Sequence, residues 1–163
     1  MENKDIKDVG KRMSQMITLQ QEFDLSFKLL RRGLGELQKI DYANDFYFMP
    51  LLLLSQGIER FLKSYIIAYK IEKEEDQLFE KKLKTHDLTE LLKLVKENYY
   101  LIGNREVDIQ DEQYLSGSAH LERVLNILSD FGQNGRYYNI DIIAKPNCSV
   151  GKPTGISKPR WIA

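Results

Sequence analysis

Apolar residues recur at alternating steps of three and four along the first quarter of the chain. Only Gln20 interrupts this alternation, which is typical of a coiled-coil-like seam and predicts a helix from about Asp5 to Ile40. Unbroken, the helix would be roughly 50 Å long at 1.5 Å per residue. Because this length exceeds a compact domain of this size, we expect a frayed start, a kink or a protruding end that packs on another subunit. The seam comprises Ile6, Val9, Met13, Met16, Phe23, Phe27, Leu30, Leu34 and Leu37.

The pattern predicts a second helix from about Phe46 to Ile71. Pro50 falls in its first turn, where a missing backbone N–H costs little. Glu59 and Lys63 stand four residues apart, in the favourable order for an ion pair. The face expected to be buried comprises Leu51, Leu54, Ile58, Phe61, Leu62, Tyr65, Ile66 and Tyr69.

A third helix is predicted after a charge-dense loop. Asp87 followed by Glu90 has the spacing of a capping pair, and Thr85 is an alternative cap. The helix is expected to bury its leucines and to end near Asn98 or Tyr100.

Residues 101–110 are interpreted as a connector before a fourth helix, expected from about Asp111 to Phe131. Gly132 and Gly135 are the residues predicted to end it. The side chains expected to point inward are Leu115, Leu121, Val124, Leu125, Leu128 and Phe131.

The fold class predicted from these segments is all-α, an antiparallel up-and-down four-helix bundle with a long first helix. The bundle domain is expected to cover residues 1–143, of which 136–143 fit either extended chain or a short last helix. Three prolines and two glycines after Ala144 argue against regular structure. Residues 144–163 are therefore predicted to form an irregular tail.

Composition gives no bulk electrostatic case for nucleic acid, because 24 basic residues balance 24 acidic ones. The C-terminal segment 132–163 nevertheless carries five basic residues against one acidic residue, a net charge of +4. The single cysteine, Cys148, allows no intrachain disulfide. The longest apolar run, Phe46 to Leu54, is far below the ~18 residues that a membrane span needs. With a charged N-terminus and no apparent signal peptide, the expected location is cytoplasmic, with no membrane partner.

Motifs for phosphate loops, serine hydrolases and zinc hydrolases are absent from the sequence. The two histidines, His86 and His120, have no second ligand at metal-binding spacing on their own helices, so neither a metal nor a cofactor is predicted. Arg136 stands beside Tyr137, and an aromatic ring next to an arginine can hold a base and a phosphate.

Three segments together resemble the HEPN superfamily, helical domains found beside minimal nucleotidyltransferases and in prokaryotic defence systems. They are Gly57-Ile58-Glu59-Arg60-Phe61-Leu62-Lys63-Ser64-Tyr65, Thr85-His86-Asp87-Leu88 and Arg136-Tyr137. Their order and approximate spacing also match, over roughly residues 46–139. The resemblance implies dimerisation through the helices, which fits the overlong first helix.

Ribonucleases of that family carry an arginine followed four to six residues later by a histidine, and this sequence has no such pair. The resemblance therefore implies a non-catalytic binding or regulatory module in a defence or toxin–antitoxin context. Its partners would be RNA, a nucleotide or a separate nucleotidyltransferase chain, alongside a second copy in a homodimer.

The candidate ligand-binding residues are Glu59, Lys63, His86, Asp87, Arg136 and Tyr137. Lys63 and Arg136 would bind phosphate, and His86 or Tyr137 would contact a base or orient Arg136. A purely structural interpretation of the same residues is a helix cap at Asp87, a surface ion pair between Glu59 and Lys63, and packing at the core edge.

Two other functions remain open. One is a ribonuclease or nucleotide-modifying enzyme with an unorthodox site, in which His86 or His120 acts as base. The other is a structural interaction protein whose first helix forms the coiled-coil seam. It predicts a dimer that is lost when Phe23 or Phe27 becomes polar.

Overall fold

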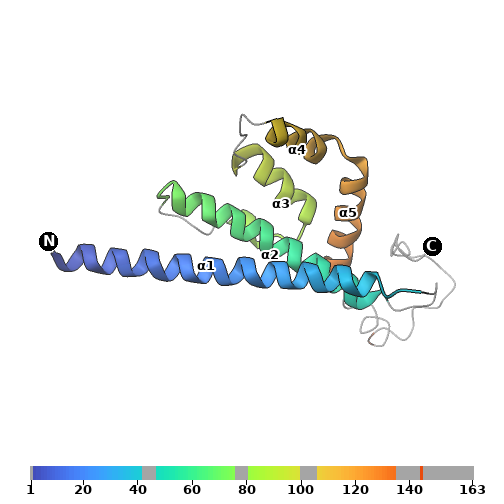
Figure 1. Ribbon diagram of the computed structural model, residues 1–163, viewed down its shortest axis with the longest axis horizontal. Helices are drawn as coiled ribbons and strands as arrows, with labels where there is room; N and C mark the ends of the chain where they lie inside the picture. Colours follow the sequence, from blue (N-terminus) through green and yellow to red (C-terminus); the bar gives the residue numbers. More distant parts are fainter. Residues whose placement is uncertain (1, 42–46, 76–80, 100–105, 135–143, 145–163) are drawn as a thin grey trace.

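The computed structural model describes residues 2–41, 47–75, 81–99, 106–134 and 144. Every regular element within those ranges is a helix, which confirms the all-α class (Figure 1). The elements are α1 (Glu2–Leu37), α2 (Phe48–Glu72), the 3-10 turn η1 (Lys81–Lys84), α3 (Leu88–Leu94), the π-helical turn η2 (Val95–Tyr99), α4 (Glu106–Gly117) and α5 (Ala119–Gln133). Among these helices, none has both the length and the apolar character that crossing a membrane requires.

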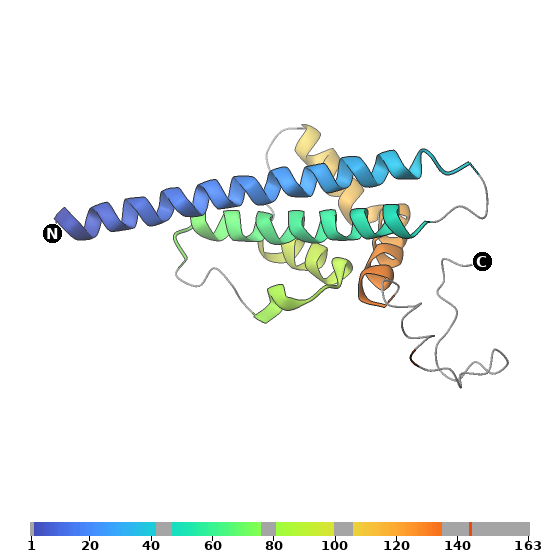
Figure 2. The same cartoon turned by 90° about the horizontal axis from the view of Figure 1, so that it is seen from below.

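α1 and α2 form a long antiparallel pair (Figure 2). Their close approach depends on two glycines. A Cβ atom on Gly33 would lie 2.7 Å from Cγ of Leu54, and one on Gly57 would lie 2.9 Å from the side chain of Leu30. Each helix thus offers a gap into which a leucine of the other fits. Although a helix-interior glycine costs about 1 kcal/mol relative to alanine, here it permits the packing.

The first helix is continuous over 36 residues. It protrudes: its N-terminal turns run past the end of α2 (Figure 2), where Arg12 Nη2 pairs with Glu74 Oε1 at 2.9 Å. Across the described ranges, the predicted seam is only partly covered by other elements. Phe23 packs edge-on against Phe61 with ring centroids 5.7 Å apart, whereas Met13 on the same seam is 65% exposed.

The core lies where α3, η2 and α5 pack on α2. Ile66 of α2 and Phe131 of α5 are fully buried, as are the leucines that open α3. Gly132 lets α5 sit close to Ser55 of α2, because a Cβ atom there would overlap the serine hydroxyl. The buried hydrophobic residues are Leu54, Leu62, Ile66, Leu83, Leu88, Leu91, Val95, Tyr99, Leu125, Leu128 and Phe131.

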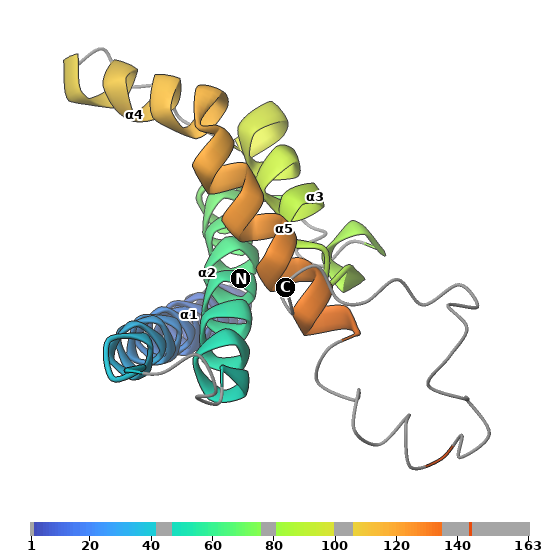
Figure 3. The ribbon, with the colours of Figure 1, turned by 90° about the vertical axis from the view of Figure 1, so that its right-hand side faces the viewer.

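The prediction of a single fourth helix is wrong, because two helices, α4 and α5, occupy this part of the chain. Residues 106–110, interpreted as connector, already belong to α4, and the chain breaks at Ser118 before α5. Ser118 adopts an extended conformation and its hydroxyl accepts the N–H of Leu121, so it caps a new helix. The described residues therefore hold five α-helices, and α4 buries none of its side chains as it leads away from the core (Figure 3).

Two further predictions for this region are wrong. Gly132 does not end the helix, which continues to Gln133. Val124 does not point inward, because its residue is 50% exposed. The expectations for Gly135, for residues 136–143 and for the tail from 145 onward fall outside the described residues.

Candidate functional site

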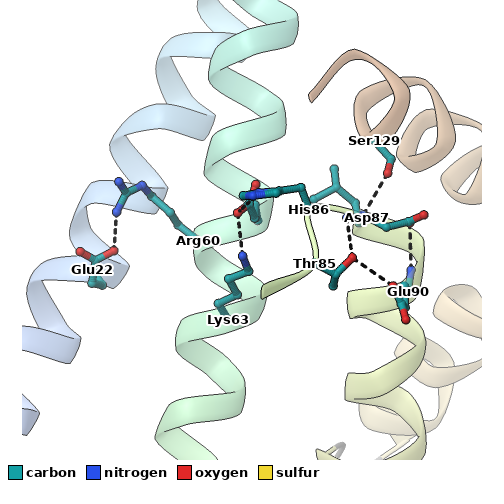
Figure 4. A network of polar contacts seen from close by, with 10 residues as sticks. Glu22, Arg60, Lys63, Thr85, His86, Asp87, Glu90 and Ser129 are labelled. Atoms are coloured by element: carbon teal, nitrogen blue, oxygen red, sulfur yellow. Dashed lines mark hydrogen bonds and ion pairs between the residues drawn. The ribbon is translucent and has the colours of Figure 1, made fainter. Parts of the chain in front are cut away.

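Three of the predicted site residues meet at one carboxylate oxygen. Glu59 Oε1 accepts a hydrogen bond from Lys63 Nζ at 2.8 Å, one turn along α2. The same oxygen lies 2.9 Å from Nδ1 of His86, which comes from the segment between η1 and α3 (Figure 4). The Glu59 and Lys63 side chains are only 18% and 20% exposed. We call these three residues the Glu59 cluster.

The Glu59 carboxylate determines how His86 presents its ring. An ionised carboxylate only accepts hydrogen bonds, so the proton between the two groups belongs to Nδ1 of the imidazole. In the neutral ring Nε2 then carries the lone pair, and in the protonated ring it is a donor. Because the His86 side chain is 55% exposed, the cluster presents an oriented imidazole at the protein surface.

Asp87 follows His86 directly, but its carboxylate serves the helix. Oδ1 accepts the hydroxyl of Thr89 at 2.6 Å and the backbone N–H groups of Thr89 and Glu90 at 2.9 and 3.1 Å. The Thr89 hydroxyl contributes most to lowering the pKa of Asp87, with the two backbone donors and Ser129 adding to it and partial burial opposing it. This confirms the predicted cap of the third helix.

The capping pair differs in detail from the usual reciprocal form. The Glu90 side chain does not reach back to the N–H of Asp87; it accepts the hydroxyl of Thr85 at 3.0 Å. The Thr85 oxygen in turn accepts the Asp87 N–H at 3.1 Å. Thr85, which was predicted as an alternative cap, therefore links Asp87 and Glu90 through its hydroxyl group (Figure 4).

Ser129 of α5 also holds this segment in place. Its hydroxyl, in a residue only 5% exposed, accepts the N–H of Leu88 at 3.1 Å. The start of α3, and with it His86, is thereby held against both α2 and α5. Sequence reasoning missed Ser129, since a lone serine on an amphipathic helix gives no signal of this contact.

Arg60 is adjacent to Glu59 in sequence but turns to the other side of α2. Its Nη1 pairs with Glu22 Oε2 of α1 at 2.7 Å, and Figure 4 shows it pointing away from His86. The Glu59 cluster thus contains one carboxylate, one ammonium group and one imidazole. The two remaining candidates, Arg136 and Tyr137, lie outside the described residues.

A separate groove of about 650 Å³ lies between α3–η2 and the corner of α4 and α5. Lys96 crosses it and donates to the Leu115 carbonyl at 2.8 Å, closing the end of α4. Leucines 92, 121 and 125 contribute apolar lining. None of the four predicted site residues that the structure describes lines this groove, and His120 is an exposed residue in the first turn of α5.

Sequence reasoning also missed Lys70, whose side chain is 1% exposed. Its Nζ pairs with Glu75 Oε2 at 3.1 Å and lies 5.8 Å from the centroid of the Tyr99 ring. We call Lys70, Glu75 and Tyr99 the Lys70 cluster. Over the described part of the chain, no group of three or more His, Cys, Asp and Glu residues could hold a metal ion.

Comparison with known proteins adds no family to this geometry. No family model, no curated protein and no solved structure matches the chain.

Proposed function

We propose that this protein is a non-catalytic, HEPN-like binding or regulatory module that takes RNA or a nucleotide at the Glu59 cluster. The supporting observation is that Glu59 Oε1 joins Lys63 and His86, at 2.8 and 2.9 Å, from two segments that the resemblance placed in one site. In this proposal the fold is a four-helix bundle in which α4 and α5 together replace the fourth helix. It acts in the cytoplasm, in a defence or toxin–antitoxin context.

The chemistry of the cluster suits a phosphate-bearing ligand. An ammonium group has three donors, and Lys63 uses one of them on Glu59. A phosphate oxygen can take another, while protonated His86 donates from Nε2. Arg136 would add a second cation and Tyr137 a ring on which a base stacks.

The protein partners in this proposal are a second copy, bound through the helices, and a separate nucleotidyltransferase-type chain. A purely structural interaction protein is the alternative if no ligand binds.

A second candidate function is an enzyme that uses His86 as a general base. The observation in its favour is the carboxylate on Nδ1, which leaves Nε2 outward as the acceptor in the neutral ring. Catalytic imidazoles are commonly oriented by a third group in this way. Such an enzyme would cleave or modify RNA or a nucleotide without the family's arginine–histidine pair.

The experiment is incubation of the full chain with mixed RNA at low and physiological salt, scoring retardation and cleavage in the same samples. Lys63→Ala, His86→Ala and Arg136→Ala are compared with wild type. Lys93→Ala is the matched control, because Lys93 is 72% exposed on α3 and pairs only loosely with Glu97, at 3.8 Å.

For a binding module we expect retardation without cleavage, weakened by Lys63→Ala with a salt slope smaller by about 1, and unchanged in the control. Cleavage that His86→Ala abolishes would establish the enzyme instead. An RNA that is neither retarded nor cleaved would overturn the RNA proposal and make a pull-down of protein partners the next step.

A further inference from the structure

One side of α1, the longest helix, is left uncovered by the other residues that the structure describes. The residues concerned lie on one face of α1, next to the edge that packs on α2, and each of them is largely exposed to solvent. Val9 and Met13 are each 65% exposed, and Met16, Phe27 and Leu34 are 54–55% exposed. We call these five residues, together with exposed Gln20, the α1 stripe.

We propose that the α1 stripe binds the α1 stripe of a second copy of this chain. This contact would be the interface of the homodimer named under the proposed function, and to that extent it rests on the proposed function. It does not depend on what the Glu59 cluster binds.

The first argument is the repeat. Met13, Gln20, Phe27 and Leu34 follow one another at intervals of seven residues. Val9, Met16, Phe23, Leu30 and Leu37 form a second row at the same interval. Two apolar rows at a seven-residue interval are the signature of a helix that pairs with another long helix over many turns.

The second argument is that α2 uses only part of this seam. Phe23 and Leu30 of the second row pack on α2, the former against Phe61 and the latter over Gly57. Phe27 touches the same Phe61 ring, at 5.6 Å between centroids, yet remains 55% exposed. The apolar residues Met13, Phe27 and Leu34 of the first row therefore each stay 55–65% exposed. The protruding N-terminal turns of α1 have no α2 beside them (Figure 2).

The third argument is self-complementarity. Gln20 is the one polar residue in its row and stands midway between Met13 and Phe27. A second copy places its own Gln20 opposite the first, whether the two helices run parallel or antiparallel. Met13 then faces Met13 in the parallel pair or Phe27 in the antiparallel one. In both registers an amide meets an amide and apolar groups meet apolar groups, as single polar layers do in paired helices.

The fourth argument is area. A half-exposed Phe or Met side chain retains on the order of 100 Å² of accessible surface. The five apolar residues of the stripe, with Ile17 beside them at 52% exposure, thus offer roughly 600 Å² on each copy. A standard interface buries about 800 Å² on each partner, so the stripe and its polar margins supply what a stable dimer needs.

The test is sedimentation velocity of the full chain at micromolar concentrations. We expect a wild-type dimer, and dissociation constants raised by about tenfold or more in Met13→Glu and Leu34→Glu. The matched control is Leu25→Glu, because Leu25 is another partly exposed apolar residue of α1, at 39%, but lies off the stripe. Far-ultraviolet circular dichroism should show the same helix content in all variants.

A cysteine series gives a second readout that needs no charged substitution in the α1 stripe. In a Cys148→Ser background, Gln20→Cys should form an intermolecular disulfide on mild oxidation and Leu25→Cys should not, since the bond needs Cα atoms within about 7 Å. Met13→Cys crosslinking to itself would indicate the parallel pair. Met13→Cys crosslinking only to Phe27→Cys would indicate the antiparallel one. Either supports the proposal.

A wild-type monomer would overturn the proposal, because the stripe would then serve the tail or a foreign partner. A dimer equally resistant to the stripe and control variants would overturn it too. The dimer test is independent of ligand binding at the Glu59 cluster, because Met13→Glu leaves Glu59, Lys63 and His86 in place. A monomeric variant that still retards RNA would retain the ligand site without the dimer.

Discussion

Lys63 and Lys70 stand seven residues apart on the same face of α2, but their surroundings differ. Lys63 is 20% exposed and shares Glu59 with an outward-facing histidine. Lys70 is 1% exposed, pairs with Glu75, and lies over the ring of Tyr99. The first ammonium group borders solvent, and the second is enclosed by η2 and the end of α2.

The difference separates a cation that stabilises the fold from one available to a ligand. A buried charge is tolerated when the protein supplies a counter-charge and other polar or aromatic contacts, as it does around Lys70. A pair that still borders solvent contributes less to stability than an enclosed one, because water continues to reach its charged groups. We therefore expect substitutions in the Lys70 cluster to act on unfolding and those in the Glu59 cluster to act on binding.

The largest effect is expected for Lys70→Ala. It removes the charge from a closed site and leaves a cavity next to Tyr99, so the free energy of unfolding should fall by about 2–4 kcal/mol. Urea denaturation followed by circular dichroism measures it. Lys70→Met, which fills the space without the charge, is the control and should recover most of the loss. Equal stabilities of Lys70→Ala and Lys63→Ala would remove the distinction between the two clusters.

Asp87→Ala should have the next largest effect, because it removes the cap that positions His86 beside Glu59. The expected loss is about 1–2 kcal/mol, whereas Asp87→Asn should keep most of the cap at neutral pH. A larger loss for the asparagine variant than for alanine would contradict a capping role.

The acid dependence of that cap follows from the lowered pKa of Asp87. A carboxyl whose pKa is lower in the folded than in the unfolded state adds stability above its ordinary pKa, near pH 4. That contribution disappears as the pH falls through the lowered value. The stability difference between wild type and Asp87→Ala, measured by urea denaturation, should therefore be constant near neutral pH and shrink below about pH 4.

The local features of the fold could be predicted from the sequence. Periodicity placed α1 and α2 within about three residues of their observed ends, and Pro50 fixed the start of the second helix. The spacing of Asp87 and Glu90 predicted the cap. The break at Ser118 could not be predicted from apolar spacing, because the pattern runs through it. Its signal was chemical: a glycine followed by a serine that accepts the Leu121 N–H.

The contacts between distant segments were harder to predict. Glu59 and His86 are 27 residues apart, and only the family resemblance placed them in one site. Lysine side chains are mostly exposed in folded proteins, and no pattern on α2 marked Lys70 as an exception. Its burial depends on Tyr99, which η2 brings over α2, and periodicity on α2 alone cannot report a ring supplied by another element.

The smallest effect, and the sharpest test of the Glu59 cluster, is expected for Glu59→Gln. The amide oxygen can still accept from Nδ1 of His86 and from Lys63, so the geometry should persist and stability should change by less than about 1 kcal/mol. Removing the negative charge beside a bound phosphate should strengthen RNA retardation by up to about fivefold at low salt and less at physiological salt. Gel retardation over a salt series, with Glu97→Gln on η2 as the control, measures this. If Glu59→Gln instead binds RNA more weakly, the ligand requires the negative charge of Glu59. The Glu59 carboxylate would then contact the ligand directly.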